Sequence, residues 1–261
     1  MPQSQIELST ANLNLKGKNA IVTGGGRDIG RACAIRLAHA GANVAINYHS
    51  SAVGAKDAAS EIEGAGGKAL ALQGDMTSDA EVDQLVEETR AMLGGRIDIL
   101  VHVTGGLIAR KKICEMSTMH WNEVLDLNAT SFFRLVRAVV PHMTGGGSIV
   151  GLASQAGRDG GGPGAVAYGA AKGAVMTMTR GLAKELGPEI RVNSVCPGMI
   201  DTEFHKNFTA PEIRGHVANI TPLKREGATE DVANLVAFLS SDQAAFITGA
   251  NIDINGGTLF S

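Results

Sequence analysis

Short apolar runs alternate along the chain with longer segments in which apolar residues recur every three or four positions. Runs rich in β-branched residues predict buried strands, and the longer spacing predicts helices with one apolar face. The first run is Asn19–Thr23, and the helix expected next, Ile29–Ala40, carries Cys33 and Leu37 on one face. The other expected strands are Ala42–Asn47, Lys68–Leu72, Ile97–Val103, Ser148–Ala153, Ile190–Val195 and Ile252–Ile254, and the other expected helices span 51–65, 78–93, 118–143, 165–187 and 229–240.

This alternation predicts an α/β fold, a doubly wound sheet of about seven parallel strands flanked by helices on both faces. Parallel neighbours need long crossover connections, and the helical segments supply them. The pattern gives residues 1–15 as a flexible N-terminal lead-in and 16–261 as a single domain. Within that domain, the segment at about 199–221 is expected to form a loop or lid over a substrate.

Composition excludes several kinds of function. The net charge is −3 and the longest basic run is Arg110–Lys112, so nucleic-acid binding has little electrostatic support. Three cysteines, far apart in the sequence, suggest neither a disulfide framework nor a metal motif. The first residues lack the features of a signal peptide, and no apolar stretch is long enough to span a membrane. We therefore expect a soluble cytoplasmic protein that acts on a small molecule without a metal.

A glycine-rich segment, Thr23–Gly30, lies between the first expected strand and the first expected helix. Glycine lets the backbone approach a diphosphate closely, and the helix N-terminus supplies free N–H groups. Asp28 is unexpected there because a carboxylate repels phosphate. We expect Asp28 to cap the helix with its carboxylate and Arg27 to restore positive charge. The alternative is a glycine turn that binds no ligand.

Tyr168 and Lys172 are four residues apart and therefore share one face of the helix expected at 165–187. A neighbouring ammonium stabilises the phenolate, so we expect Lys172 to lower the pKa of Tyr168 toward the range useful for acid–base catalysis. Ser154 follows the fifth expected strand, at the sheet edge where ligands gather. Asn128 lies in the preceding long helix. The alternative is a surface tyrosine with an unrelated lysine.

Together these motifs resemble the short-chain dehydrogenase/reductase family, in the style of its 3-oxoacyl reductases and sugar dehydrogenases. The resemblance spans about residues 16–257. It implies a Rossmann-type domain in which Tyr168 exchanges a proton with the reacting oxygen and Ser154 orients that oxygen. It also implies that Lys172 tunes Tyr168 and bonds the nicotinamide ribose, and that Asn128 holds a water of a proton relay. The motifs that carry the resemblance are Thr23–Gly30, Asp75, Asn128, Ser154, Tyr168, Lys172, Pro197-Gly198, Ile247–Gly249 and Asn255–Gly257.

The same resemblance implies a set of cofactor contacts. Asp75 would meet the adenine, although its spacing suits a turn residue equally well, and Ile200 and Thr202 would fix the nicotinamide ring. No acid follows the second strand before Asp57, so a ribose 2′-hydroxyl lacks its usual acceptor. NADP(H) is therefore favoured, with NAD(H) possible. The expected cofactor-binding residues are Gly24, Gly26, Arg27, Asp28, Ile29, Gly30, Asn47, His49, Ser50, Asp75, Met76, Thr104, Gly105, Tyr168, Lys172, Pro197, Gly198, Ile200 and Thr202.

The chain departs from the family pattern in two motifs. Asp28 replaces the middle glycine of the phosphate loop, and His102 and Val103 replace the first and second asparagines of the motif N-N-A-G. The asparagine of this motif helps to hold the central sheet together in the family. We therefore expect His102 to be a local hydrogen-bonding residue, with a catalytic histidine as the alternative.

Basic residues near the expected substrate side suggest a polar substrate. Arg110 and Arg158 could bind an anionic group such as a sugar-acid carboxylate, or they could be solvated loop charges. The resemblance implies NADPH-dependent reduction of a small polar oxo compound, such as a keto sugar acid or a 3-oxoacyl compound. The alternatives are an NAD-linked sugar or polyol dehydrogenase and a catalytically silent nucleotide-binding regulator. The two long helices, 118–143 and 165–187, imply a homotetramer by the same resemblance.

Overall fold

The computed structural model describes residues 13–261, so most of the expected lead-in, residues 1–12, lies outside the described residues. Leu15 belongs to that expected lead-in, but its side chain is buried in the hydrophobic core. Its N–H group also donates to Ala40 O at 2.8 Å. The described end of the lead-in therefore packs on the fold. Among residues 13–261, no helix is both long and apolar enough to cross a membrane.

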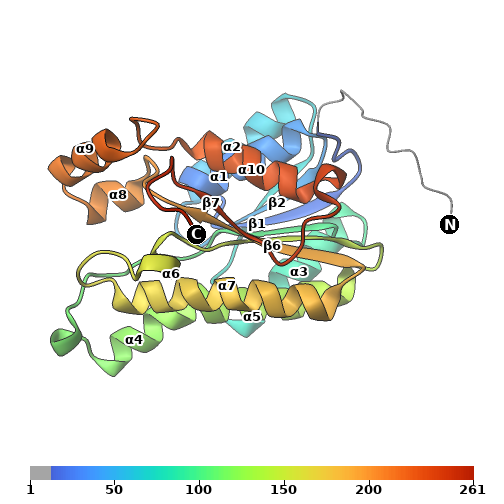
Figure 1. Ribbon diagram of the computed structural model, residues 1–261. Helices are drawn as coiled ribbons and strands as arrows, with labels where there is room; N and C mark the ends of the chain where they lie inside the picture. Colours follow the sequence, from blue (N-terminus) through green and yellow to red (C-terminus); the bar gives the residue numbers. More distant parts are fainter. Residues whose placement is uncertain (1–12) are drawn as a thin grey trace, which may run out of the picture.

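Seven strands of the described chain form one parallel sheet in the order β3-β2-β1-β4-β5-β6-β7, which confirms the expected doubly wound α/β architecture (Figure 1). The expected and observed ends of the strands agree to within a few residues. The strands are β1 (Asn19–Thr23), β2 (Asn43–Tyr48), β3 (Ala69–Gln73), β4 (Ile99–His102), β5 (Gly147–Leu152), β6 (Ile190–Pro197) and β7 (Asn251–Ile254).

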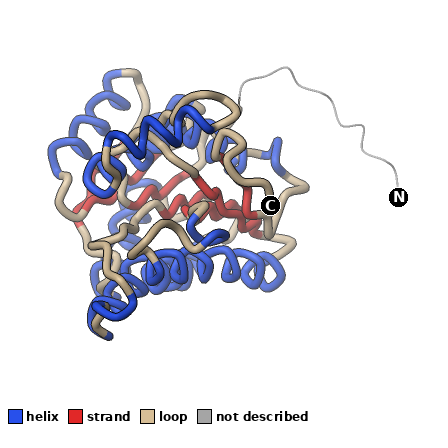
Figure 2. Tube along the Cα trace, turned by 60° about the vertical axis from the view of Figure 1, so that its left-hand side comes forward, coloured by secondary structure: helices blue, strands red, loops and turns tan. Residues whose placement is uncertain are grey.

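Helices cover both faces of this sheet, which lies between them as a central layer (Figure 2). On one face pack α1, α2 and α10, and on the other α3, α5 and α7. Along β1, Ala20 and Val22 join the first hydrophobic cluster while Ile21 joins the second. This burial on both faces explains the continuous apolar runs. The six helices are α1 (Asp28–His39), α2 (Ala52–Gly64), α3 (Asp79–Leu93), α5 (Ser131–Val139), α7 (Val166–Leu186) and α10 (Thr229–Ser240).

The helix expected at 118–143 is not uniform. It begins as α4 (Thr118–Leu125), passes through a π-helical turn at Asp126–Thr130, continues as α5 and ends in a 3₁₀ turn at Val140–His142. Single π turns inside α-helices often occur at functional sites. This one contains Asn128, which the sequence had singled out.

Three helices lie where the sequence predicted only loops. They are α6 (Ala156–Asp159), α8 (Glu203–Phe208) and α9 (Pro211–Ile220). Each is too short for an apolar repeat to distinguish a helix from a loop. The last two belong to the segment 199–221, which we call the lid and which follows β6 at one end of the sheet (Figure 1).

Candidate active site

The strand order reverses between β1 and β4, because the chain moves outward from β1 to β3 and then returns to β4 on the other side of β1. In open parallel sheets, ligands bind at such a reversal, outside the carboxyl ends of the strands. Thr23 at the end of β1 pairs with His102 at the end of β4. The loops that follow these two strands therefore begin side by side.

The loop after β1 turns tightly against the first turn of α1. Gly24 has a φ of +63°, a conformation that favours glycine. A Cβ on Gly30 would lie 2.1 Å from Gly24 O, so only glycine fits there. A Cβ on Gly26 would lie 2.5 Å from Ser51 O. The glycines thus keep this loop compact and leave its backbone accessible to a close-lying ligand.

The N-terminus of α1 presents backbone N–H groups beside this loop. The backbone of its N-cap residue, Arg27, is extended, and the Arg27 side chain makes no capping hydrogen bond to the first turn of α1. Helix N-termini of this kind bind anions through N–H groups and the helix dipole. The glycine loop and the start of α1, including Ile29, therefore fit the diphosphate of a dinucleotide cofactor.

Asp28 does not cap α1, so that expectation is wrong. Its carboxylate turns instead to the lid, where Oδ1 accepts a hydrogen bond from Glu203 N at 3.3 Å. Arg27 Nε lies 3.8 Å from the other carboxylate oxygen, which agrees with the expected local compensation of charge. The reason is position: Asp28 is the first residue of α1, one place beyond the N-cap residue Arg27, whose side chain is the one placed to cap the helix.

The residues after β2 divide into buried and exposed groups. Asn47 is 1% exposed, and its side-chain amide donates to Gly74 O at 3.0 Å. Asn47 is therefore part of the sheet edge, and its side chain is not available to a ribose phosphate. His49 and Ser50 are exposed, as a contact to that part of a cofactor requires.

Asp75 and Met76 have different surroundings after β3. The Asp75 carboxylate accepts from Thr77 N and Thr77 Oγ1, both at 2.8 Å. Partial burial opposes ionisation, but these hydrogen bonds outweigh it and lower the pKa of Asp75. Asp75 thus acts as a turn residue in this structure. The Met76 side chain lies in the hydrophobic core.

Ser154, Tyr168 and Lys172 come together at the carboxyl edge of the sheet. Ser154 follows β5, and the other two lie one turn apart on α7. The Ser154 hydroxyl lies close enough to the phenol of Tyr168 to favour its ionised form, and it accepts from Ala156 N at 3.1 Å. Lys172 Nζ lies 5.6 Å from the centroid of the Tyr168 ring. The spacing seen in the sequence therefore places these three groups around one point.

Burial determines the protonation of both helix residues. It raises the pKa of Tyr168 to about 12, although the Ser154 hydrogen bond opposes the shift. Burial also lowers the pKa of Lys172 to about 8. The expected lowering of the tyrosine pKa by the ammonium is therefore not found. The Lys172 ammonium donates to Leu152 O at 2.7 Å, so it is engaged by the end of β5.

Asn128 joins the π turn to the loop after β4. Its side-chain amide donates to Gly106 O and to Val124 O, both at 2.8 Å. Its Oδ1 accepts from Gly106 N at 3.0 Å. A Cβ on Gly105 would lie 2.6 Å from this oxygen and 3.0 Å from Lys172 Nζ. The side chain of Asn128 thus fixes the loop, and both of its amide hydrogens are already used.

His102 is the centre of a directional chain of hydrogen bonds. Ser131 Oγ donates to Leu127 O at 2.6 Å, so it must accept from His102 Nε2 at 3.1 Å. His102 Nδ1 then accepts from Thr23 Oγ1 at 3.0 Å. That oxygen in turn accepts from the backbone N–H groups that follow β4, at Val103 and Thr104. Burial, with a smaller effect of the Lys172 charge, lowers the pKa of His102 to about 3, so the ring is neutral.

The segment after β6 also lies close to the end of a neighbouring strand. Gly198 N donates to Ile254 O at 3.1 Å, so Pro197 and Gly198 lie beside β7. Ile200 and Thr202 are both buried, and the Thr202 hydroxyl donates to Ile200 O at 3.1 Å. The hydroxyl that the resemblance assigns to the nicotinamide is therefore used within its own turn.

Aromatic side chains of the lid lie against Tyr168. The Phe204 ring lies 5.7 Å from the Tyr168 ring, centroid to centroid. His205 and Phe208 surround Phe204 at 5.0 Å and 5.3 Å. No sequence motif indicated this contact, although the number of rings within α8 was a weak sign. The lid therefore contacts the ring of Tyr168 directly.

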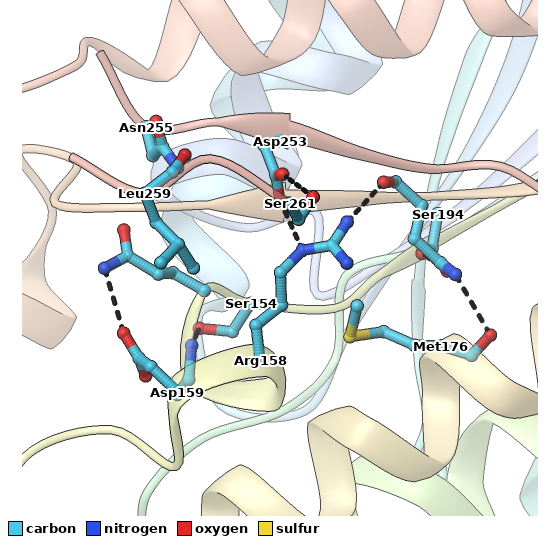
Figure 3. A network of polar contacts seen from close by, with 12 residues as sticks. Ser154, Arg158, Asp159, Met176, Ser194, Asp253, Asn255, Leu259 and Ser261 are labelled. Atoms are coloured by element: carbon cyan, nitrogen blue, oxygen red, sulfur yellow. Dashed lines mark hydrogen bonds and ion pairs between the residues drawn. The ribbon is translucent and has the colours of Figure 1, made fainter. Parts of the chain in front are cut away.

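The two arginines proposed for the substrate both have partners. Arg110 donates to Phe208 O at 3.1 Å and to Pro163 O at 3.0 Å, so it joins the lid to the loop before α7. Arg158 donates to the Asp253 carboxylate at 2.7 Å and to Asn251 O at 2.6 Å (Figure 3). The charge of Arg158 is thus neutralised by β7. This arrangement does not favour Arg158 as an anion-binding residue.

A family model described as "Enoyl-(Acyl carrier protein) reductase" matches residues 24–258. The 3-oxoacyl-(acyl-carrier-protein) reductase FabG of Escherichia coli (strain K12) is 38% identical over 248 residues, which cover 94% of this chain and 98% of that protein. A structure of 7 alpha-hydroxysteroid dehydrogenase complexed with NADH and 7-oxo glycochenodeoxycholic acid is 36% identical, with a TM-score of 0.89, and the match covers 94% and 96% of the two chains. A blue fluorescent protein from a metagenomic library, in complex with NADPH, is 35% identical, with a TM-score of 0.88 and coverage of 95% and 100%.

The fold and the site thus define an NAD(P)-dependent oxidoreductase that acts on CH–OH and C=O groups. The family model matches residues 24–258, and the relative from Escherichia coli covers 94% of this chain at 38% identity. The chain belongs to the short-chain dehydrogenase/reductase family and is similar to its 3-oxoacyl reductases.

Proposed function

We propose that this enzyme uses NADPH to reduce the ketone of a small polar oxo compound, with a 3-oxoacyl thioester as the leading substrate class. One observation carries the proposal. A protonated phenol, Tyr168, and a hydroxyl, Ser154, lie close together beside the ammonium of Lys172. Two hydroxyl donors at one point can bind a single carbonyl oxygen. The naming of its relatives as 3-oxoacyl reductases supports the same reading.

Each residue has a distinct part in the reduction. The nicotinamide cofactor, when bound, supplies the hydride that reaches the carbonyl carbon. Ser154 donates a hydrogen bond to the carbonyl oxygen and orients it. Tyr168, with a pKa of about 12, is protonated at neutral pH and transfers its proton to that oxygen, so C=O becomes CH–OH. Lys172, with a pKa of about 8, is then still charged and stabilises the phenolate that remains.

The surroundings of the site favour some substrates over others. Because Asp253 neutralises Arg158, a sugar-acid carboxylate would lose one of its two proposed partners. The paired hydroxyl donors suit a carbonyl oxygen better than the carbon–carbon double bond of an enoyl thioester, despite the description of the family model. A 3-oxoacyl thioester therefore fits the observations better than either of these.

Turnover assays test this proposal. Purified protein with NADPH would be given a 3-oxoacyl thioester, a keto sugar acid, a 7-oxo steroid and an enoyl thioester, and the loss of reduced cofactor followed by absorbance. We expect the 3-oxoacyl thioester to have the highest kcat/KM. Reduction of the enoyl compound alone would contradict the proposal. Cofactor binding without turnover of any substrate would instead favour the silent regulator.

NADPH is proposed on the residues that face the adenosine side. The Arg27 side chain, after β1, is 61% exposed, and His49 and Ser50, after β2, are exposed as well. Fluorescence titration should show tighter binding of NADPH than of NADH, and Arg27→Ala should reduce that difference about tenfold, as loss of a charged hydrogen bond does. Equal or tighter binding of NADH would favour the NAD-linked sugar or polyol dehydrogenase.

A homotetramer is proposed as well, as the family resemblance implied. Large apolar side chains are exposed on α4 and α5, at Met119 and Phe133, and near the C-terminus, at Phe246 and Phe260. Subunit contacts would cover such groups. Light scattering of the purified protein measures the assembly directly, and a monomer at assay concentration would contradict it.

A further inference from the structure

Asp28 has two features that need an explanation. Its φ of +48° lies in the left-handed region, which few side chains adopt. Its carboxylate also stands in a loop that otherwise suits an anion, where its charge would repel a diphosphate. Glycine would remove both difficulties at once. A residue that is unfavourable in these two ways calls for a compensating contact.

That contact is with the lid. Asp28 Oδ1 accepts a hydrogen bond from Glu203 N at 3.3 Å, across 175 residues of sequence. Glu203 is the first residue of α8, so its N–H group has no partner within the helix. The N-cap residue, Thr202, makes no side-chain cap within the described chain, because its hydroxyl donates to Ile200 O. Asp28 therefore supplies from the phosphate loop the cap that α8 lacks.

The capped end of α8 is next to the catalytic tyrosine. Phe204 follows Glu203 directly, and its ring lies 5.7 Å from the Tyr168 ring at an angle of 34°. A fixed position for the backbone of Glu203 thus limits where Phe204 can lie. The phosphate loop and the reacting phenol are connected through this short path.

We propose that Asp28 is a positioning residue that latches the lid to the phosphate loop and so holds Phe204 over Tyr168. This proposal rests on the proposed function in one respect, which is that the lid covers the substrate. The essential property of Asp28 is then its hydrogen-bond acceptor, and its negative charge is a side effect. Acceptor and charge can be separated by substitution.

Two variants of Asp28 make that separation. Asp28→Asn keeps an oxygen acceptor and loses the charge, whereas Asp28→Gly loses both and relieves the left-handed backbone, so it should fold. A lost cap shifts a local equilibrium about fivefold. We therefore expect Asp28→Gly to lower kcat/KM for the ketone about fivefold. Asp28→Asn should keep most of the parent's kcat/KM. Both variants should change NADPH affinity to the same extent.

The donor side of the bond offers a matched pair of variants. Glu203→Pro deletes the N–H group, and the backbone can accept it. Thr202 is extended (φ −147°, ψ 161°), as a residue before proline should be, and proline is favoured at the first helical position. Glu203→Ala keeps the N–H group and removes only the side chain that pairs with Lys206. We expect Glu203→Pro to match Asp28→Gly, and Glu203→Ala to resemble the parent.

Hydrogen exchange of peptides covering 203–208, measured without substrate, reads the latch directly. Compared with the parent protein, exchange should be faster in Asp28→Gly and in Glu203→Pro. The variant with both substitutions should exchange no faster than either single variant. Exchange should be unchanged in Asp28→Asn and Glu203→Ala. Unchanged exchange in Asp28→Gly, or equal acceleration in Asp28→Asn, would overturn the proposal. Because this readout needs no turnover, it stands even if no tested ketone is a substrate.

Discussion

Two regions that meet at Tyr168 are built in different ways. Below the phenol, Lys172 and Asn128 are almost completely buried and bonded to the backbone of β5 and of the loop after β4. Above it, the lid leaves apolar side chains such as Ile213 and Ile220 more than half exposed. The rigid region can hold the reacting groups in place, whereas the lid can adjust to a substrate. Changes below Tyr168 should therefore reduce kcat, and changes above it should mainly raise KM.

The largest effect is expected from Tyr168→Phe, which removes only the hydroxyl that we propose as the proton donor. Loss of a general acid typically reduces the rate by about 10²–10⁴-fold, so kcat should fall by at least about 100-fold. The phenylalanine ring can still contact Phe204, so NADPH binding and the folded structure should be retained. Steady-state kinetics and fluorescence titration together check this, and a loss confined to KM would contradict the division between the two regions.

His102→Ala should have the next largest effect. It leaves the hydroxyls of Thr23 and Ser131 without their shared partner in a buried place. Unmet buried groups of this kind cost about 1–3 kcal/mol, which denaturant unfolding would measure. Because the same series of hydrogen bonds fixes the backbone N–H groups of Val103 and Thr104 after β4, kcat should fall as well. His102→Asn, which restores the residue usual in the family, should recover part of both losses.

The tautomer of His102 provides an independent check. Nitrogen chemical shifts of the ring should show a proton on Nε2 and none on Nδ1 at neutral pH, because Ser131 and Thr23 determine the donor and the acceptor. A protonated Nδ1 would mean that the hydrogen bonds from Ser131 through His102 to Thr23 have the opposite donors and acceptors.

The same division describes what the sequence could predict. The sheet follows from periodicity, and the shared face of Tyr168 and Lys172 follows from spacing, because α7 is a regular element whose geometry fixes the direction of its side chains. The grouping of Ser154 with them was predicted from its place after the fifth strand and from the family resemblance. The ion pair of Arg158 could not be predicted from the sequence, because its partner, Asp253, is 95 residues away and no local pattern relates them. The contact from Asp28 to Glu203 was missed for the same reason. The pKa of Tyr168 was predicted in the wrong direction, because spacing shows a neighbouring charge but not burial.

On the lid side, Phe204→Ala should have a smaller effect than either change below the phenol. An aromatic contact of this kind contributes about 0.5–1.5 kcal/mol, so KM should rise about two- to tenfold with little change in kcat. Phe208→Ala removes a ring that contacts Phe204 at 5.3 Å, one step further from Tyr168. It serves as the matched control and should have a weaker effect. A fall in kcat larger than the rise in KM would show that the lid takes part in positioning the phenol.

The smallest effect is a change of stability with pH that reports on the buried lysine. Burial lowers the pKa of Lys172 to about 8 from 10.5, so between these values the unfolded chain binds more protons than the folded one. Stability from this group therefore rises with pH, by about 1 kcal/mol between pH 8 and 9. Above pH 9 the buried thiols of Cys33 and Cys196, whose pKa values are raised to about 12 and 11, act in the opposite sense.

Comparison with Lys172→Met separates these contributions, since the cysteines are the same in both proteins. The free energy of unfolding, measured by denaturant titration at pH 8 and pH 9, should increase with pH about 1 kcal/mol more in the parent than in the variant. An equal pH dependence in the two proteins would mean that Lys172 keeps an ordinary pKa. The region below Tyr168 would then be more hydrated than its buried side chains indicate, and the contrast with the lid would be lost.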